Sequence, residues 1–236
     1  MSQLLTILKM KMPGLKLLII ITCLVIFNQI TYSQVINTGA SIKQEVMKAF
    51  GGEAAMKQVK ELTYTLEKGK IGGAKTKERV TIYFRDVEVK QVFSKEGVAI
   101  TRLYSNGRIW EKKNGNTVEL PKEQSKKLSN LFFYNFIGLL KDDLVKWKFI
   151  KSTTYRQQPV RIVRVSNEQY QLDLFINRQG EIVTSASPKV GPYLYYADEF
   201  EYKSIGKGIR FPLVFKVAKD GKYTYKGKFK EVEVAH

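Results

Sequence analysis

The stretch Leu128-Ser-Asn-Leu-Phe-Phe-Tyr-Asn-Phe-Ile-Gly-Leu-Leu140 decides the expected fold, because it is the longest apolar run outside the N-terminus. Its positions 128, 131, 132, 135, 136, 139 and 140 follow the helical i, i+3, i+4, i+7 spacing, and all are apolar except Asn135. Phe133 and Ile137 form a second apolar row, an i, i+4 pair beside the main stripe. A helix that is apolar on more than one side must be covered on more than one side. We therefore expect a helix over 128–140 that packs on a curved sheet.

The sequence on both sides of this stretch alternates between apolar and polar residues, as antiparallel strands do. Asn106-Gly107 and Asp220-Gly221 are typical two-residue hairpin turns between such runs. Ten or eleven strands are expected, with no βαβ alternation and no internal repeat. Such a large antiparallel sheet must curl to bury one face. The expected fold class is mainly β (α+β): a curved antiparallel sheet, or half-barrel, covered by a few helices.

Two short helices are expected before the first strand. Residues 41–60 are helical in pattern, but Gly51-Gly52 interrupts them, so the second helix begins near Glu53 and ends near Val59.

Three further expectations concern the strands themselves. Lys68–Lys77 contains three glycines and four lysines, which predicts a long turn. Pro212 lacks a backbone N–H, which predicts an edge position or a bulge. In the last strand the apolar parity changes between Phe229 and Val232, which predicts a bulge near Lys230.

Residues 1–33 have the composition of a signal peptide. Three lysines form its basic part, and Leu15–Phe27 forms an apolar core too short and too early for a comfortable membrane span. Thr31 and Ser33 are small residues at the −3 and −1 positions of a cut before Gln34. We therefore expect a signal peptide over 1–33, a single domain over 34–236, and a periplasmic or secreted protein. The alternative is an uncleaved membrane anchor.

The residue inventory argues against most catalytic chemistry. The only histidine is His236, the last residue, and the only cysteine is Cys23, inside the predicted signal. This disfavours Ser-His-Asp and Cys-His triads and the common zinc sites, so no catalytic residue, metal or cofactor is predicted. Asp198, Glu199 and Glu201 form the one acidic cluster, which is typical of a solvated strand face.

The net charge of +18 favours anionic surfaces as partners. Export argues against nucleic acid and favours an anionic surface of the cell envelope. A solvated basic surface that only aids solubility is the alternative. We expect a monomer.

The candidate ligand-binding residues are the apolar residues of the central stretch together with tyrosines that follow Pro192, namely Phe132, Phe133, Asn135, Phe136, Ile137, Leu140, Tyr193 and Tyr195. The phenylalanines and aliphatic residues would meet an apolar chain. Tyrosine offers an apolar body and a polar tip at a cavity mouth. A buried Asn135 needs hydrogen-bond partners, either strand backbone or a ligand headgroup. Simple core packing is the alternative role for all of them.

The order of these segments resembles a known family. A helix, the run Phe50–Lys60 and a first strand are similar to the opening of exported Gram-negative proteins of the outer-membrane lipoprotein-sorting type (LolA-like). The ending resembles their closing hairpin, in the segments Asp198–Lys203, Gly208–Pro212 and Lys219–Lys222. The resemblance implies a half-barrel whose open side is covered by helices and which encloses a cavity for acyl chains.

These observations predict a non-enzymatic carrier or binder of a hydrophobic or amphiphilic ligand, such as a lipid, an acyl chain or a lipoprotein, in the cell envelope. The alternative is a structural or protein-interaction module whose cavity is filled by its own side chains. A void separates the two, because a barrel of this size is either packed solid or encloses a ligand.

Overall fold

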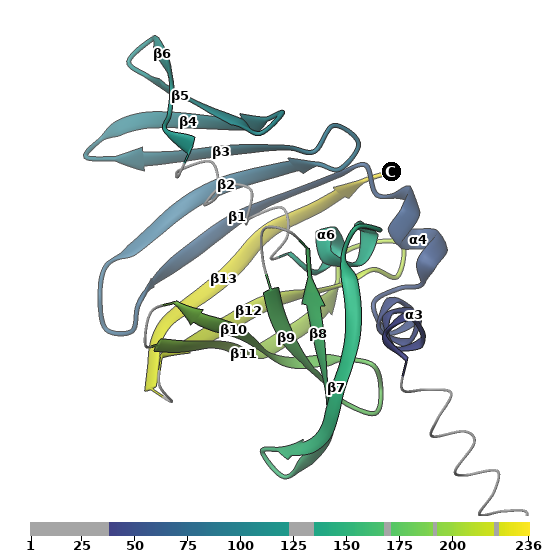
Figure 1. The fold of residues 1–236 in the computed structure, drawn as a ribbon. Coiled ribbons are helices and arrows are strands. Elements are labelled where there is room, and N and C mark those ends of the chain that lie inside the picture. The colour runs from purple at the N-terminus through teal and green to yellow at the C-terminus, as the bar shows by residue number, and fades with distance from the viewer. Residues whose placement is uncertain (1–37, 123–134, 168–170, 191–192, 220–221) are drawn as a thin grey trace, which may run out of the picture.

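The computed structural model describes residues 38–122, 135–167, 171–190, 193–219 and 222–236. These residues form one antiparallel sheet of 13 strands, in the order β6-β5-β4-β3-β2-β1-β13-β12-β11-β10-β9-β8-β7 (Figure 1). The strands are β1 Glu61–Lys70, β2 Lys75–Tyr83, β3 Glu88–Lys95, β4 Val98–Ser105, β5 Arg108–Lys113, β6 Asn116–Glu119, β7 Lys146–Tyr155, β8 Gln158–Ser166, β9 Gln171–Ile176, β10 Ile182–Val190, β11 Tyr193–Ser204, β12 Arg210–Lys219 and β13 Lys222–Ala235.

The strand order explains where the central stretch of the chain must go. Each strand pairs with its neighbours in sequence, except that β1 pairs with β13 and β6 does not pair with β7. β6 and β7 are therefore the two edges of the sheet, and the chain between them crosses from one edge to the other. That crossing contains the helix α6, Phe136–Lys141. The fold is thus a curved sheet with a helical crossing on its concave side, as Figure 1 shows.

Two helices precede the sheet, as expected: α3 Gly39–Ala49 and α4 Glu53–Gln58. Thr38 caps α3, because its side-chain oxygen accepts a hydrogen bond from the backbone N–H of Ser41. α3 packs against the edge strand β7, and α4 packs against α6. The helices therefore cover one end of the concave side, where Ile42, Val46 and Met56 are fully buried.

The expected fold class is confirmed, since the described residues form a large curved antiparallel sheet with three short helices. The strand number is 13 rather than ten or eleven, because short segments such as β6 are full members of the ladder. The glycine turn that was expected at Asn106-Gly107 joins β4 to β5, and a similar turn at Asn114-Gly115 joins β5 to β6, with positive φ angles at all four residues.

The prediction of a long turn over Lys68–Lys77 is wrong. β1 continues to Lys70 and β2 begins at Lys75, which leaves only residues 71–74 for the turn. The lysines are tolerated in the ladder because carboxylates oppose them. Glu67 lies opposite Lys77, and Glu78 forms an ion pair with Lys68 at 2.7 Å.

The prediction of one continuous helix over 128–140 is also wrong. Asn135 has an extended backbone (φ −84°, ψ 141°), so no helix passes through it. It is the N-cap of α6, and its side-chain oxygen accepts a hydrogen bond of 2.6 Å from the backbone N–H of Gly138. The polar residue in the apolar stripe marks a helix start, not a buried site within a helix. Residues 123–134 lie outside the described residues.

Both predicted strand irregularities are present. The β1–β13 register shifts between Thr63 and Thr65, opposite Glu231, whose φ angle is 51°. The β11–β12 register shifts at Tyr202, the partner of Pro212. β12 lies between β11 and β13, so Pro212 is at an irregularity and not at an edge.

Candidate functional site

The concave side of the sheet is covered at one end and more exposed at the other. At the covered end, Leu62, Ile209 and Phe211 are at most 1% exposed. The ring of Phe136, from α6, lies in an aromatic cluster here with Phe50 at 5.7 Å, Phe200 at 5.2 Å and Tyr202 at 6.2 Å between ring centroids. We call this region the covered end, defined by Leu62, Phe136, Ile209 and Phe211.

α6 is buried on every side, because Phe136, Ile137, Gly138, Leu139 and Leu140 are all buried. Its last residue, Lys141, fixes it to the end of α4. The Lys141 ammonium donates to the carbonyl oxygens of Met56 at 3.0 Å, Lys57 at 3.1 Å and Val59 at 2.7 Å. Carbonyls at a helix C-terminus are not fully satisfied within the helix, so a cation is favoured there. Of these three carbonyls, that of Met56 also accepts from the backbone N–H of Val59 at 3.2 Å. Burial lowers the pKa of Lys141.

The more exposed part of the concave side lies on β12 and β13. Leu213, Phe215 and Val217 alternate along β12, and all three are half-buried. On β13, Phe229 is half-buried and Tyr225 is 42% exposed. Val217 lies directly opposite Tyr225 in the ladder. We call these five residues the open floor: Leu213, Phe215, Val217, Tyr225 and Phe229.

Gly227 shapes the open floor. It lies opposite Phe215, and a Cβ atom at this position would be 2.1 Å from the Phe215 ring. The ring therefore covers the glycine backbone directly, which only a residue without a side chain permits. Phe215 also contacts Phe229, with ring centroids 5.3 Å apart, and Phe229 contacts Tyr64 and Phe211 of the core at 5.0 and 5.1 Å. The open floor is thus an extension of the core aromatic packing.

A polar network borders this floor on the β1–β3 side. Glu78, which is buried, accepts hydrogen bonds from Lys68 at 2.7 Å and from Gln91 at 2.8 Å. Lys68 lies opposite Gly227 in the ladder, so it adjoins the floor, and its side chain is 42% exposed. Burial and the nearby Glu78 charge raise the pKa of Tyr64. Because Phe215 covers Gly227, the ammonium group of this network, that of Lys68, lies on a residue next to the aromatic rings of the open floor.

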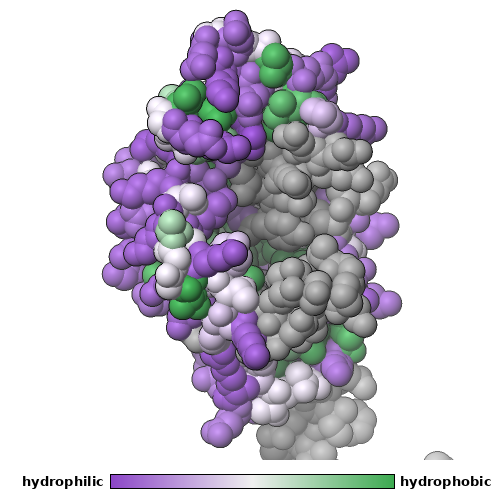
Figure 2. Space-filling model, turned by 90° about the vertical axis from the view of Figure 1, so that its left-hand side faces the viewer, coloured by the Kyte–Doolittle hydropathy of each residue, from purple (hydrophilic) through white to green (hydrophobic). Residues whose placement is uncertain are grey.

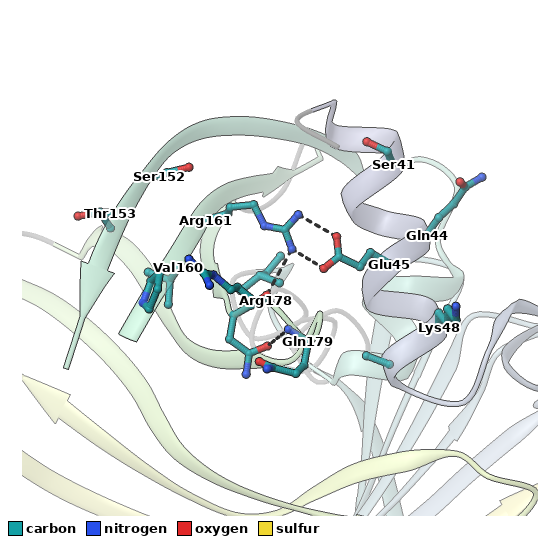
Figure 3. A pocket seen from close by; sticks show the side chains of 14 residues that line it. Ser41, Gln44, Glu45, Lys48, Ser152, Thr153, Val160, Arg161, Arg178 and Gln179 are labelled. Carbon is teal, nitrogen blue, oxygen red and sulfur yellow. Dashed lines mark hydrogen bonds and ion pairs between the residues drawn. The ribbon is translucent and has the colours of Figure 1, made fainter. Parts of the chain in front are cut away.

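A separate groove of about 1050 Å³ lies between α3 and the strands β7–β9 (Figure 3). Arg161 from β8 points across it to Glu45 of α3, and the two side chains form a double hydrogen bond of 2.8 and 2.5 Å. Arg161 also donates to the backbone carbonyl of Asn177 at 3.3 Å. The guanidinium group is therefore already occupied by the protein, and we interpret this contact as structural.

The structure places the predicted site residues in different environments. Asn135, Phe136, Ile137 and Leu140 lie together at the covered end, within the core and away from the open floor. Phe132 and Phe133 lie outside the described residues. Tyr193 and Tyr195 begin β11, of which the structure describes only the backbone there. Ligand binding by these eight residues therefore stays a prediction.

The open floor was not singled out from the sequence as a site. The alternation from Ile209 to Val217 is visible as one apolar strand face, but all its members have the same pattern. Nothing local to the strand distinguishes buried Phe211 from half-buried Phe215. The distinguishing feature is the extent of the helices that cover the sheet, which is a tertiary property.

Two other kinds of site are absent from the described ranges. No group of three or more His, Cys, Asp or Glu residues there is arranged to hold a metal ion. None of the helices in those ranges has both the length and the apolar character needed to cross a membrane.

The fold has clear relatives among solved structures. A LolA superfamily protein from Nitrosomonas europaea superposes with a TM-score of 0.57 at 10% identity, over 84% of this chain and 94% of that one. The fold is LolA-like. A putative outer membrane lipoprotein-sorting protein domain from Vibrio parahaemolyticus gives a TM-score of 0.55 at 10% identity, over 83% and 92% of the two chains. No family model and no curated protein matches the sequence.

The resemblance that was seen in the sequence is thus confirmed at the level of fold. The two LolA-like structures also match most of their own length, so the likeness extends over the curved sheet and its helices. At 10% identity the likeness describes the backbone, and it transfers no residue role to this chain.

Proposed function

We propose that the protein binds an acyl chain, or an amphiphile that carries one, on the open floor and holds it without chemical change. The observation that carries this proposal is the partial exposure of five apolar side chains on the concave side of β12 and β13. Leaving apolar surface in contact with water costs about 25 cal/mol per Å². A chain laid along Phe215 and Phe229 would remove that surface from water.

The surroundings of the open floor suit an amphiphile better than a purely apolar ligand. Lys68 adjoins the floor and is part-exposed, while Glu78 and Gln91 hold it in place. An acyl chain with an anionic headgroup would place the headgroup at Lys68 and the chain over the aromatic rings. The predicted export signal over 1–33 supports a location outside the cytoplasm, and 34–236 would be the working domain.

The competing proposal is an interaction module whose concave side is filled by its own side chains. Its support is the covered end, where Phe136 and Leu140 fill the space between the sheet and α4. The two proposals differ at the open floor. The open floor must accept a ligand if the protein is a carrier, and it need not if the protein is an interaction module.

Native mass spectrometry of the protein purified from its own cells tests the proposal first. We expect a bound species with the mass of a fatty acid or phospholipid, on a chain that begins at Gln34. Thermal unfolding with added palmitate tests it quantitatively. At about 100 times the dissociation constant, a ligand stabilises the folded state by about 2.7 kcal/mol. For a chain of this size the melting temperature should rise by roughly 5–10 °C.

A pair of variants makes this test specific. Phe215→Ala changes the open floor, and Phe149→Ala changes a half-buried aromatic residue on β7. Both should lower the melting temperature of the free protein. Only Phe215→Ala should reduce the palmitate-dependent rise. No co-purified lipid together with no rise in the wild-type protein would contradict the proposal and favour the interaction module.

A further inference from the structure

The convex side of the sheet carries a basic patch that follows from the strand register. β12, β13, β1 and β2 are adjacent, and their outward residues align in rows across the ladder. One row, nearest the β1–β2 turn, consists of Lys216, Lys226, Gly69 and Lys75. The next contains Lys228, Glu67 and Lys77, and the third contains Lys230, Thr65 and Arg79. We call the seven cations of these rows the basic patch: Lys75, Lys77, Arg79, Lys216, Lys226, Lys228 and Lys230.

Two carboxylates form ion pairs or hydrogen bonds within the second and third rows. Glu67 forms ion pairs with Lys230 at 2.9 Å and with Lys77 at 3.2 Å, and the hydrogen bonds from these two lysines lower the pKa of Glu67. Glu231 lies 3.5 Å from Arg79 and accepts a hydrogen bond from Thr65. These two carboxylates therefore neutralise the second and third rows in part.

In the row nearest the turn, Lys216 lies between Asp198 of β11 and Lys226 of β13 in the ladder. Lys216 and Lys226 are directly opposite each other in the ladder, an arrangement of like charges that destabilises a sheet. Among the described residues, no carboxylate forms an ion pair with Lys75, Lys226 or Lys228. Together with the β1–β2 turn, these three lysines border a groove of about 590 Å³. Six lysines and one carboxylate, Glu67, line this groove, so positive charge predominates around it.

An exposed apolar side chain lies at that same end. Ile71 is the first residue of the β1–β2 turn, and its side chain is 55% exposed. Lys70 precedes it directly, and Lys75 follows the turn. Its backbone N–H donates to the carbonyl of Thr224 at 3.1 Å, which fixes the turn to β13. Figure 2 looks at the molecule from the left-hand side of Figure 1, where the β1–β2 turn lies, and hydrophilic residues cover most of the described surface in that view. Ile71 is thus an apolar tip within a charged surface.

We propose that the basic patch and Ile71 dock the protein on a bilayer of anionic phospholipid, with the lysines at the headgroups and Ile71 in the interface. Cations near an anionic bilayer strengthen binding, and an apolar side chain among them adds insertion into the headgroup boundary. An acidic protein would account for the lysines but not for the isoleucine. The site is on the convex side, so it does not depend on ligand binding at the open floor.

Sedimentation with vesicles tests this proposal. The protein is expressed from the full sequence, purified from the producing cells, and mixed with phosphatidylcholine vesicles that contain or lack phosphatidylglycerol. Each cation near such a surface strengthens partitioning on the order of fivefold. The triple variant K75Q/K226Q/K228Q should therefore bind the anionic vesicles on the order of 100-fold more weakly at low salt.

A charge-matched control separates the patch from net charge. K146Q/K148Q/K151Q removes three exposed lysines of β7 and should bind nearly as well as the wild-type protein. Ile71→Ser should weaken binding severalfold, whereas Val118→Ser, at a 53% exposed position of β6, should not. The difference between the triple variants should shrink at high salt.

Three results would overturn the proposal. They are no binding of the wild-type protein to anionic vesicles at low salt, equal losses in the two triple variants, and unchanged vesicle binding of Ile71→Ser. The second would mean that only net charge matters. The third would mean that the patch recognises charge alone, as an acidic protein partner would require.

Discussion

Two phenylalanines on the same face of β12 lie in different surroundings. Phe211, near the start of the strand, is 1% exposed, whereas Phe215, one i, i+4 step further, is half-buried. Both contact Phe229 at nearly the same centroid distance, 5.1 and 5.3 Å. The difference lies in what covers them, because the helices lie over one end of the concave side. One strand face can therefore serve as core at one end and as a binding surface at the other.

The covered end should respond most strongly to mutation. Phe136→Ala removes a ring that is 5% exposed and contacts three other aromatic rings. We expect a loss of about 3–5 kcal/mol in the free energy of unfolding, measured by urea denaturation. A loss of under about 1 kcal/mol would show that this end is not a rigid core.

The loss of the Lys141 hydrogen bonds between α6 and α4 should have the next largest effect on stability. Lys141→Met keeps the length of the side chain but removes three hydrogen bonds to the end of α4. We expect a loss of about 1.5–3 kcal/mol, because three hydrogen bonds from a charged group are lost. Lys141→Arg serves as the control and should recover part of the stability. Equal stability of Lys141→Met and the wild-type protein would contradict this role.

The open floor should be less sensitive. Phe215→Ala should cost about 1–2 kcal/mol, since a half-buried ring loses fewer contacts than a buried one. Phe211→Ala, on the same strand, is the matched control and should cost about 3–5 kcal/mol. Urea denaturation of the two variants measures the difference directly. Equal losses would mean that the two ends are packed alike and that no part of the strand is reserved for a ligand.

The smallest effect is expected from an ion pair beside the covered end. Burial would raise the pKa of Glu181, but hydrogen bonds from Arg210 and Asn177 lower it below its ordinary value. Glu181 therefore contributes stability above its unfolded pKa of about 4.3, and this is lost as the pH falls through the lower, folded pKa. Glu181→Gln should cost under about 1 kcal/mol at neutral pH, and its stability should fall less steeply in acid. Parallel acid profiles for variant and wild type would contradict this.

The sequence was sufficient for the architecture because its signals are local. Alternation of apolar residues, glycine turns and the parity change near Lys230 each report on a few neighbouring positions. The structure contains the alternation, the Asn106-Gly107 turn and the register shift. The expected turn at Asp220-Gly221 lies outside the described residues. The Lys68–Lys77 turn was misread because glycine and lysine disfavour strands locally. Cross-strand partners such as Glu78, which is ten positions from Lys68, stabilise the longer strands, and this pairing depends on the strand register rather than on local propensity.

The candidate site was less predictable for the same physical reason. Asn135 was recognised as an oddity within an apolar stripe, but its role as an N-cap depends on a helix start that the apolar spacing concealed. The contrast between Phe211 and Phe215 depends on how far the helices reach, and the basic patch depends on the register of four strands. Neither is visible from spacing along one segment.

The most direct test of the account is photo-crosslinking with a palmitate analogue that carries a diazirine in its acyl chain. We expect labels on the open floor, at residues such as Phe215 and Phe229, and competition by unlabelled palmitate. Labels confined to the outward lysines of β13 would indicate attraction of the carboxylate alone. Labels on the edge strands, or none that palmitate displaces, would contradict the claim that the open floor holds an acyl chain.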